Sequence, residues 1–208
     1  VFRTCPATGR RIDLSAELLI KVHAVCSVVA LLVGAIAAVL IVLTRWQAVH
    51  LLPAEWFYRI LGVHGMSMLI FFIIFFEMAV LIFTSTVLLN ARQVAVRTGW
   101  LAFGLMLLGA LVVEWMMWAG RADVLFTSYV PLRADPMFYL GVILFAVGAL
   151  VTVGLFFANL VVAKREKRYE GSLPLVVFGA ITAAIIAVIT LVHGAAIYIP
   201  TCLWSLGL

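Results

Sequence analysis

The chain has 208 residues, of which 66% are hydrophobic and 11% charged, and its mean hydropathy is +1.25. Because soluble domains carry about 25% charged residues, this composition excludes a soluble globular protein and indicates an integral membrane protein. The formal net charge of +5 does not indicate nucleic-acid binding, since the basic residues lie in short clusters between apolar runs. The three cysteines form no CxxC pair, so the sequence contains neither a zinc motif nor a disulfide framework.

Five apolar runs follow one another along the chain, at about residues 22–43, 60–89, 99–119, 137–162 and 175–199. Each run is long enough, at ~1.5 Å per residue, to cross about 30 Å of hydrocarbon as a helix. The connections between the runs are short, which is typical of antiparallel neighbours in one bundle. The sequence therefore predicts an all-α polytopic membrane helix bundle with five transmembrane helices, forming a single membrane domain over residues 1–208.

The basic residues predict the orientation of these helices. Four of the fourteen fall on one side of the membrane, namely Arg45, Arg59, Arg121 and Arg133. The others fall on the opposite side, namely Arg3, Arg10, Arg11, Lys21, Arg92, Arg97, Lys164, Arg165, Lys167 and Arg168. By the positive-inside rule, the N-terminus is expected in the cytoplasm and the C-terminus outside.

Small residues on two of the spans predict close helix packing, because they let neighbouring backbones approach in lipid. On the first and third spans these residues are Gly34, Ala35, Ala37, Ala38, Gly104 and Gly109. Ionisable residues inside a span are costly and suggest function by default. Those in the predicted spans are His23, His64, Glu77, Glu114 and His193.

His64 lies about five residues past Arg59, roughly 7 Å below the predicted outer interface at ~1.5 Å per residue. Gly65 beside it leaves room for a flat macrocycle, and Met68 and two phenylalanines follow. Imidazole is the commonest proximal ligand of haem iron. His64 is therefore a candidate haem ligand, with a hydrogen-bonded core histidine as the alternative.

Four short segments occur in an order and spacing that resemble a known family. They are Leu61–Met66 (LGVHGM), Phe126–Leu132 (FTSYVPL), Phe138–Gly141 (FYLG) and Leu203–Gly207 (LWSLG). From the first span onward, the chain resembles the N-terminal part of subunit I of the haem–copper terminal oxidases (cytochrome c oxidase), nearest to the B-type branch. Val130 stands where relatives commonly carry a second proline.

The resemblance implies that His64 is one axial ligand of the low-spin haem b, which accepts electrons before the oxygen-reducing centre. It also implies that Tyr129 lies near the haem pocket and Gly65 packs against the haem. The family's subunit I has about twelve helices, so the second axial histidine, the high-spin haem and the copper ligands are expected outside this chain. Three explanations are open: a partial chain, a split subunit or a degenerate paralogue.

His193 gives a second hypothesis, because it lies about seven residues before Pro200, roughly 10 Å below the outer interface at ~1.5 Å per residue. If its helix faces that of His64, the two histidines could ligate a haem as in a self-contained membrane cytochrome b. The alternative for His193 is an interhelical hydrogen bond. A haem-free structural subunit is the third functional hypothesis.

The remaining ionisable residues have weaker functional interpretations. Glu77 should point about 140° away from His64 at ~100° per residue, and either a proton relay or a neutral hydrogen-bonding acid fits its position. Glu114 is expected to bridge to Arg121 or another outer arginine, or to belong to a proton exit route. His23 is expected to extend from the inner end of the first span to the interface.

Taken together, the sequence favours part of the catalytic subunit of a respiratory terminal oxidase, embedded in a bacterial or archaeal cytoplasmic membrane. The expected partners are the remainder of subunit I, other oxidase subunits, and cytochrome c or quinol as electron donor. Electron transfer to oxygen with proton translocation is the expected activity of the assembly. The high-spin haem and the copper centre are expected only on the rest of the subunit or on a partner chain.

Overall fold

The computed structural model of the chain describes residues 1–124, 127–169 and 171–208. Among these residues, five helices are long and apolar enough to cross a membrane. They are α1 (Leu14–Arg45), the continuous segment Ala54–Thr86, α4 (Val96–Trp118), α5 (Pro136–Arg165) and α6 (Leu175–Leu206). The prediction of five long apolar helices is confirmed.

The second of these helices changes its winding along its length. It consists of α2 (Ala54–Gly65), a π-helix η1 (Met66–Phe72) and α3 (Ile73–Thr86). A π-helix closes hydrogen bonds between residues five apart and is rare, occurring mostly as single turns that are frequent at functional sites. Nothing in the sequence indicated this wide turn.

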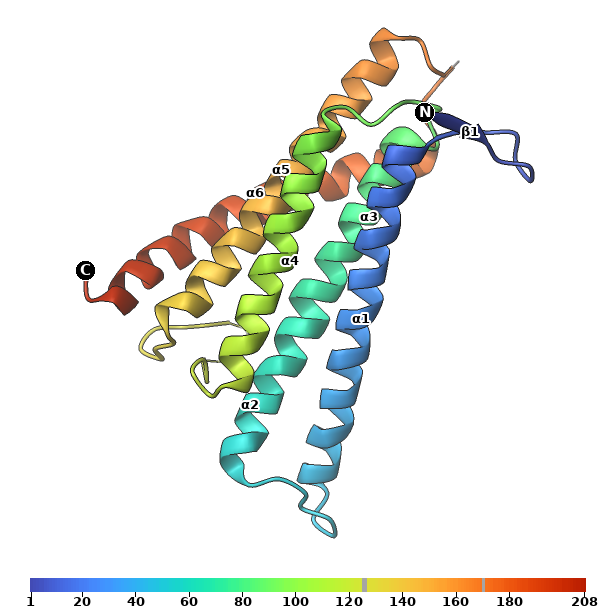
Figure 1. Cartoon of the computed structure of the whole chain (residues 1–208). Coiled ribbons are helices and arrows are strands. Elements are labelled where there is room, and N and C mark those ends of the chain that lie inside the picture. The colour runs from blue at the N-terminus through green and yellow to red at the C-terminus, as the bar shows by residue number, and fades with distance from the viewer. Residues whose placement is uncertain (125–126, 170) are drawn as a thin grey trace.

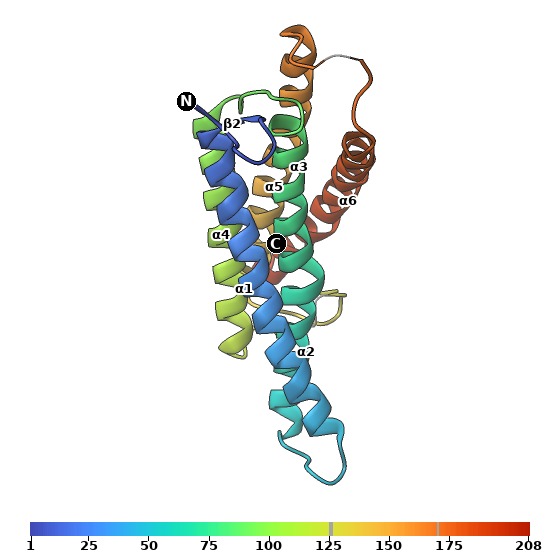
Figure 2. The same cartoon turned by 90° about the vertical axis from the view of Figure 1, so that its right-hand side faces the viewer.

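Four of the membrane-spanning helices run roughly side by side, whereas α6 crosses them at an angle (Figures 1 and 2). The α1 helix packs along α2, η1 and α3, and α4 packs along most of α5. The α6 helix packs on α5 and α3. The second span therefore lies between α1 on one side and α4 and α5 on the other.

Polar caps set where two of the helices begin. Asp13 precedes α1 and accepts a hydrogen bond from Ser15 N at 3.2 Å, and Asp135 precedes α5 and accepts one from Met137 N at 2.9 Å. Such side chains satisfy backbone N–H groups that have no partner within the helix. The helices therefore extend beyond the apolar runs, which mark only the part expected in hydrocarbon.

The residues before α1 form a small antiparallel hairpin whose second strand leads directly into the helix. Its strands are β1 (Phe2–Thr4) and β2 (Arg11–Asp13). Arg10 donates to Leu88 O at 2.9 Å, which fixes the hairpin to the end of the second span.

The α6 helix continues through Pro200, although the sequence placed the end of the span at Ile199. Proline lacks a backbone N–H, but membrane helices tolerate it where nearby hydroxyl groups bond the carbonyls around the break. Thr201 Oγ1 donates to Ile197 O at 2.7 Å.

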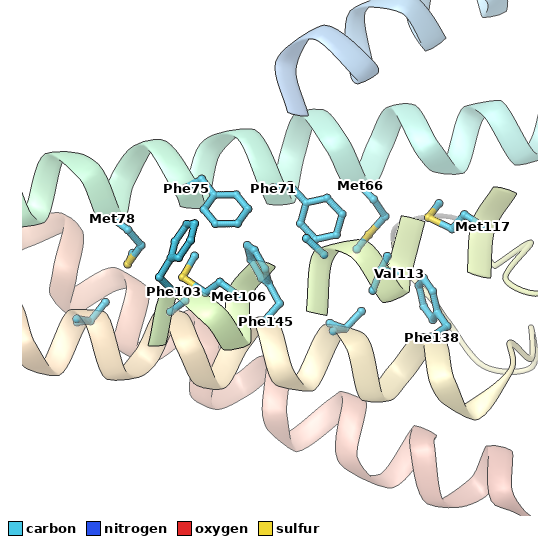
Figure 3. Packing of buried hydrophobic residues seen from close by; sticks show 14 of the residues in the cluster. Met66, Phe71, Phe75, Met78, Phe103, Met106, Val113, Met117, Phe138 and Phe145 are labelled. Atoms are coloured by element: carbon cyan, nitrogen blue, oxygen red, sulfur yellow. The ribbon is translucent and has the colours of Figure 1, made fainter. Parts of the chain in front are cut away.

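Aromatic and methionine side chains fill the core between the second span, α4 and α5 (Figure 3). Phe71 and Phe75 point toward Phe145 of α5, with ring centroids 5.0 and 5.3 Å from it in edge-to-face geometry. Phe103 and Met106 of α4 pack into the same cluster. This face of the second span is therefore held by close apolar packing.

Two of the glycines predicted to allow close packing do so. A Cβ on Gly109 would lie 2.6 Å from Phe145 N and still closer to Gly141 O, so α4 and α5 touch through their backbones. Gly34 allows a close contact of a different kind, because a Cβ there would meet the side chain of Met68 on the second span. The prediction is wrong for Gly104, which faces open space on the exposed side of α4.

Gly109→Ala is expected to lower the unfolding free energy by about 1–3 kcal/mol, the usual cost of overpacking. The physical reason is that the new methyl group would meet backbone atoms of α5, which cannot rotate away. Thermal unfolding of the purified protein measures the effect. Gly104→Ala is the matched control on the same helix, and equal stability losses in the two variants would contradict the packing account.

Candidate functional site

His64 is fixed by a hydrogen bond to a different helix. Its Nδ1 lies 2.9 Å from Gly34 O of α1. Because a carbonyl oxygen can only accept, Nδ1 must carry the proton, and in the neutral ring Nε2 keeps its lone pair. His64 Nε2 has no hydrogen-bond partner among the described residues and is absent from their buried unpartnered atoms. It therefore reaches the surface of the chain as a free electron-pair donor.

The other two histidines of the spans are held differently. His23 Nδ1 bonds Leu19 O at 2.8 Å and His193 Nδ1 bonds Ile189 O at 2.7 Å, in each case four residues earlier on the same helix. A bond within one helix orients the ring only relative to that helix. Only His64, among these three, has its ring hydrogen-bonded to a second helix.

His23 is fully buried, so the expectation that it extends to the interface is wrong. Its ring packs edge-on against Phe103, with centroids 4.9 Å apart, and Nε2 has no hydrogen-bond partner. The reason is that His23 lies on the face of α1 that packs against the bundle. The basic residue beside it, Lys21, is the one that is exposed.

His193 lies on an exposed face of α6. Among the described residues, the hydrogen bond of His193 joins its Nδ1 to Ile189 O of the same helix, and the expected bond to another helix is not found. His64 points to α1, whereas α6 packs on α5 and α3. The structure therefore does not bring the two histidines together as a ligand pair.

Three contacts join the second span to α1 around His64. Besides the bond from the imidazole to Gly34 O, Ser27 Oγ donates to Phe72 O at 3.0 Å. Between these two points, Met68 packs where Gly34 has no side chain, since a Cβ there would lie 2.6 Å from Met68 Sδ. The imidazole is thus held in a fixed position at the junction of α2 and η1.

Glu114 lies on the opposite side of the second span, on α4. Its Oε1 accepts a hydrogen bond from Ser67 Oγ at 2.7 Å. The expected ion pair with Arg121 is not formed, because Arg121 pairs with Asp135 instead. The two side chains do not meet because Glu114 points into the bundle, whereas Arg121 lies in the exposed loop after α4.

The other predicted site residues are not gathered around His64. Gly65 is buried at the end of α2. Glu77 is partly buried on α3, and no hydrogen bond to it is found among the described residues. Because η1 lies between His64 and Glu77, the angle expected for a uniform α-helix does not apply. Tyr129 is 69% exposed in the loop between α4 and α5, and Phe126 of the same motif lies outside the described residues.

An apolar cavity of about 180 Å³ lies between η1, α5 and α6. Met66 and Ile70 line it on one side, and Gly194 and Ala195 line it on the other. No histidine, cysteine or carboxylate is among its described lining residues. The cavity was not predicted from the sequence.

Residues 19–207 match the family model described as cytochrome c and quinol oxidase polypeptide I. The chain belongs to this family. The match covers all five long apolar helices except the first turns of α1, so the predicted family is confirmed. A search of curated proteins finds no match.

A solved structure of a haem–copper terminal oxidase dimer is similar to this family member. The two chains share 28% sequence identity and superpose with a TM-score of 0.76. The similarity covers 86% of this chain and 31% of the other. The chain therefore spans about a third of the length of that relative.

The residues around His64 fit one axial position of a haem. The family relative is a haem–copper oxidase, and an axial histidine needs a deprotonated, accessible nitrogen with its other nitrogen hydrogen-bonded. His64 meets these requirements through its free Nε2 and the bond to Gly34 O. Among the described residues there is no group of three or more metal-ligating side chains.

Gly34→Ala is expected to lower the unfolding free energy by about 1–3 kcal/mol through overpacking against Met68. In the double variant Gly34→Ala/Met68→Ala, the obstructing side chain is absent. The double variant should therefore lose less unfolding free energy than the sum of the losses in the two single variants. Thermal unfolding of the four proteins measures the coupling. Gly154→Ala, where the new methyl group meets nothing within 4 Å, is the control. Strict additivity would contradict the proposed contact.

Proposed function

We propose that the chain is part of the catalytic subunit of a respiratory haem–copper oxidase and that His64 Nε2 is one axial ligand of its low-spin haem b. The observation that carries this proposal is the bond from His64 Nδ1 to Gly34 O, which leaves Nε2 free and fixes the ring between two helices. Family membership and the position of His64 in the LGVHGM segment support the same role.

The residues of this chain bind and orient the haem in this proposal. Gly34 O accepts a hydrogen bond from His64 Nδ1, which fixes the tautomer with Nε2 unprotonated and fixes the orientation of the ring. Gly65 leaves room beside the ligand, and Met68 packs along the same face. When bound, the haem supplies one-electron transfer toward the oxygen-reducing centre.

The rest of the proposed machinery lies outside this chain. The second axial histidine, the high-spin haem and the copper centre belong to the remainder of subunit I or to a partner chain. The electron donor is cytochrome c or quinol. Within this chain, Tyr129 is proposed to lie near the haem pocket, and Glu77 and Glu114 are candidates for a proton path.

Two alternative functions of the chain are less well supported by its geometry. A self-contained cytochrome b needs His193 as the second ligand, but His193 points away from the bundle and is bonded to its own helix. A haem-free structural subunit would not require an accessible Nε2 on an interhelically fixed histidine. The geometry of His64 therefore favours the oxidase subunit.

His64→Ala is expected to abolish the low-spin haem signal, because no other accessible histidine nitrogen is held at this position. The measurement is the electron paramagnetic resonance spectrum, together with pyridine-haemochrome content, of the protein isolated in its native assembly. His193→Ala is the matched control and should leave both unchanged. Retention of the low-spin signal in His64→Ala would disprove the ligand assignment, and its loss in His193→Ala would favour the self-contained cytochrome.

We also propose that the protein lies in a bacterial or archaeal cytoplasmic membrane with its N-terminus inside. Gln47 and Lys167 lie in loops at opposite ends of the bundle. In a variant without the native cysteines, Gln47→Cys should react with an impermeant maleimide on intact cells. Lys167→Cys should react only after permeabilisation. The reverse labelling pattern would contradict the orientation.

A further inference from the structure

The wide turn η1 begins two residues after His64, so its position decides where the ligand-bearing end of the second span is directed. The backbone of a π-turn departs from the regular i→i−4 ladder. Side chains from neighbouring helices can therefore determine its register. Ser67, the second residue of η1, is buried and lies three residues after His64.

Neighbouring helices hold η1 from two sides. On the α1 side, Gly34 O accepts a hydrogen bond from His64 Nδ1. Ser27 Oγ of α1 donates a hydrogen bond to Phe72 O, at the last residue of η1. On the α4 side, Glu114 Oε1 accepts a hydrogen bond from Ser67 Oγ. Among the described residues, this is the only side-chain hydrogen bond between η1 and α4. The contacts with α1 and the contact with Glu114 therefore hold the turn from opposite sides of the second span.

Burying the carboxyl group of Glu114 is energetically unfavourable if the residue serves only to pack two helices together. One carboxyl oxygen bonds Ser67, and the side chain of Trp118 on the same helix lies close enough to interact with the carboxyl group, but Oε2 has no partner in hydrogen-bond geometry among the described residues. Burying a polar atom without a partner is unfavourable. An apolar side chain of similar volume would fill the same space at lower cost. The single interaction that Glu114 makes with another helix is directed at the turn that follows His64.

We propose that Glu114 is a positioning residue for His64: through Ser67 it fixes the rotation of η1 and thereby the direction in which Nε2 approaches the haem iron. This inference rests on the proposed function, because it requires His64 to be the ligand. Axial-ligand orientation and hydrogen bonding around the ligand tune the reduction potential of a haem. A change at Glu114 should therefore alter the haem without removing it.

The test compares Glu114→Leu, Ser67→Ala and Glu114→Gln in the protein isolated in its native assembly. The first two variants remove the hydrogen bond from opposite partners, whereas the glutamine retains an oxygen that accepts from Ser67. Thr84→Val is the control for loss of a buried hydroxyl, since Thr84 bonds only carbonyls of its own helix at 2.8 and 3.1 Å. The readouts are haem content, the g-values of the low-spin ferric haem and the ratio of reduced to oxidised haem at a fixed ambient potential.

Glu114→Leu and Ser67→Ala are expected to retain the haem, to shift its g-values and to change the reduced-to-oxidised ratio at least threefold in the same direction. Glu114→Gln and Thr84→Val should match the unmodified protein in haem content, g-values and the reduced-to-oxidised ratio. If Glu114→Leu does not assemble, Ser67→Ala decides the question. Unchanged g-values and an unchanged ratio in Ser67→Ala would overturn the positioning role, as would an equal effect in Thr84→Val.

His64→Ala, measured beside these variants, separates the two proposals. If it abolishes the low-spin signal while Ser67→Ala leaves the spectrum unchanged, the ligand assignment stands and the positioning role of Glu114 is wrong. If it leaves the low-spin signal intact, the ligand assignment itself is wrong.

Discussion

Inside hydrocarbon a polar group has no water to bond, so a partner on its own helix or on a neighbouring one stabilises it. The histidines of this chain illustrate both solutions. His23 and His193 turn back to carbonyl groups of their own helices, whereas His64 crosses to Gly34 O of α1. The crossing bond orients one imidazole relative to two helices, and it is the constraint on which the proposed site depends.

The same requirement explains how the second span is held. A π-turn disturbs the backbone ladder, and it is stable here because α1 and α4 supply bonding groups on both sides of it. Ser27 of α1 donates a hydrogen bond to the carbonyl of Phe72, the last residue of the turn. Ser67, within the turn, donates one to Glu114 of α4. Apolar packing around Phe145 holds the face toward α5. His64 therefore lies just before a segment that is held on three sides.

The sequence predicted much of the fold, because uninterrupted apolar runs long enough to cross a bilayer have few alternatives to a membrane helix. It did not predict the helix starts, since a cap such as Asp13 lies outside the apolar run. It identified His64 because an imidazole stands out in an apolar span. It could not identify Gly34 O, because a backbone carbonyl has no signature in the sequence. For Glu114 the sequence left open an outer arginine or a proton exit route, and it could not indicate Ser67, since that contact depends on the rotation of two helices.

The central claim is that His64 Nε2 ligates the iron of a low-spin haem while Nδ1 remains bonded to Gly34 O. An experimental structure of the protein in its native assembly tests this most directly. The account predicts haem iron within coordination distance of His64 Nε2, with the imidazole still bonded to α1. A haem bound elsewhere, or an imidazole of His64 that contacts no iron, would contradict it.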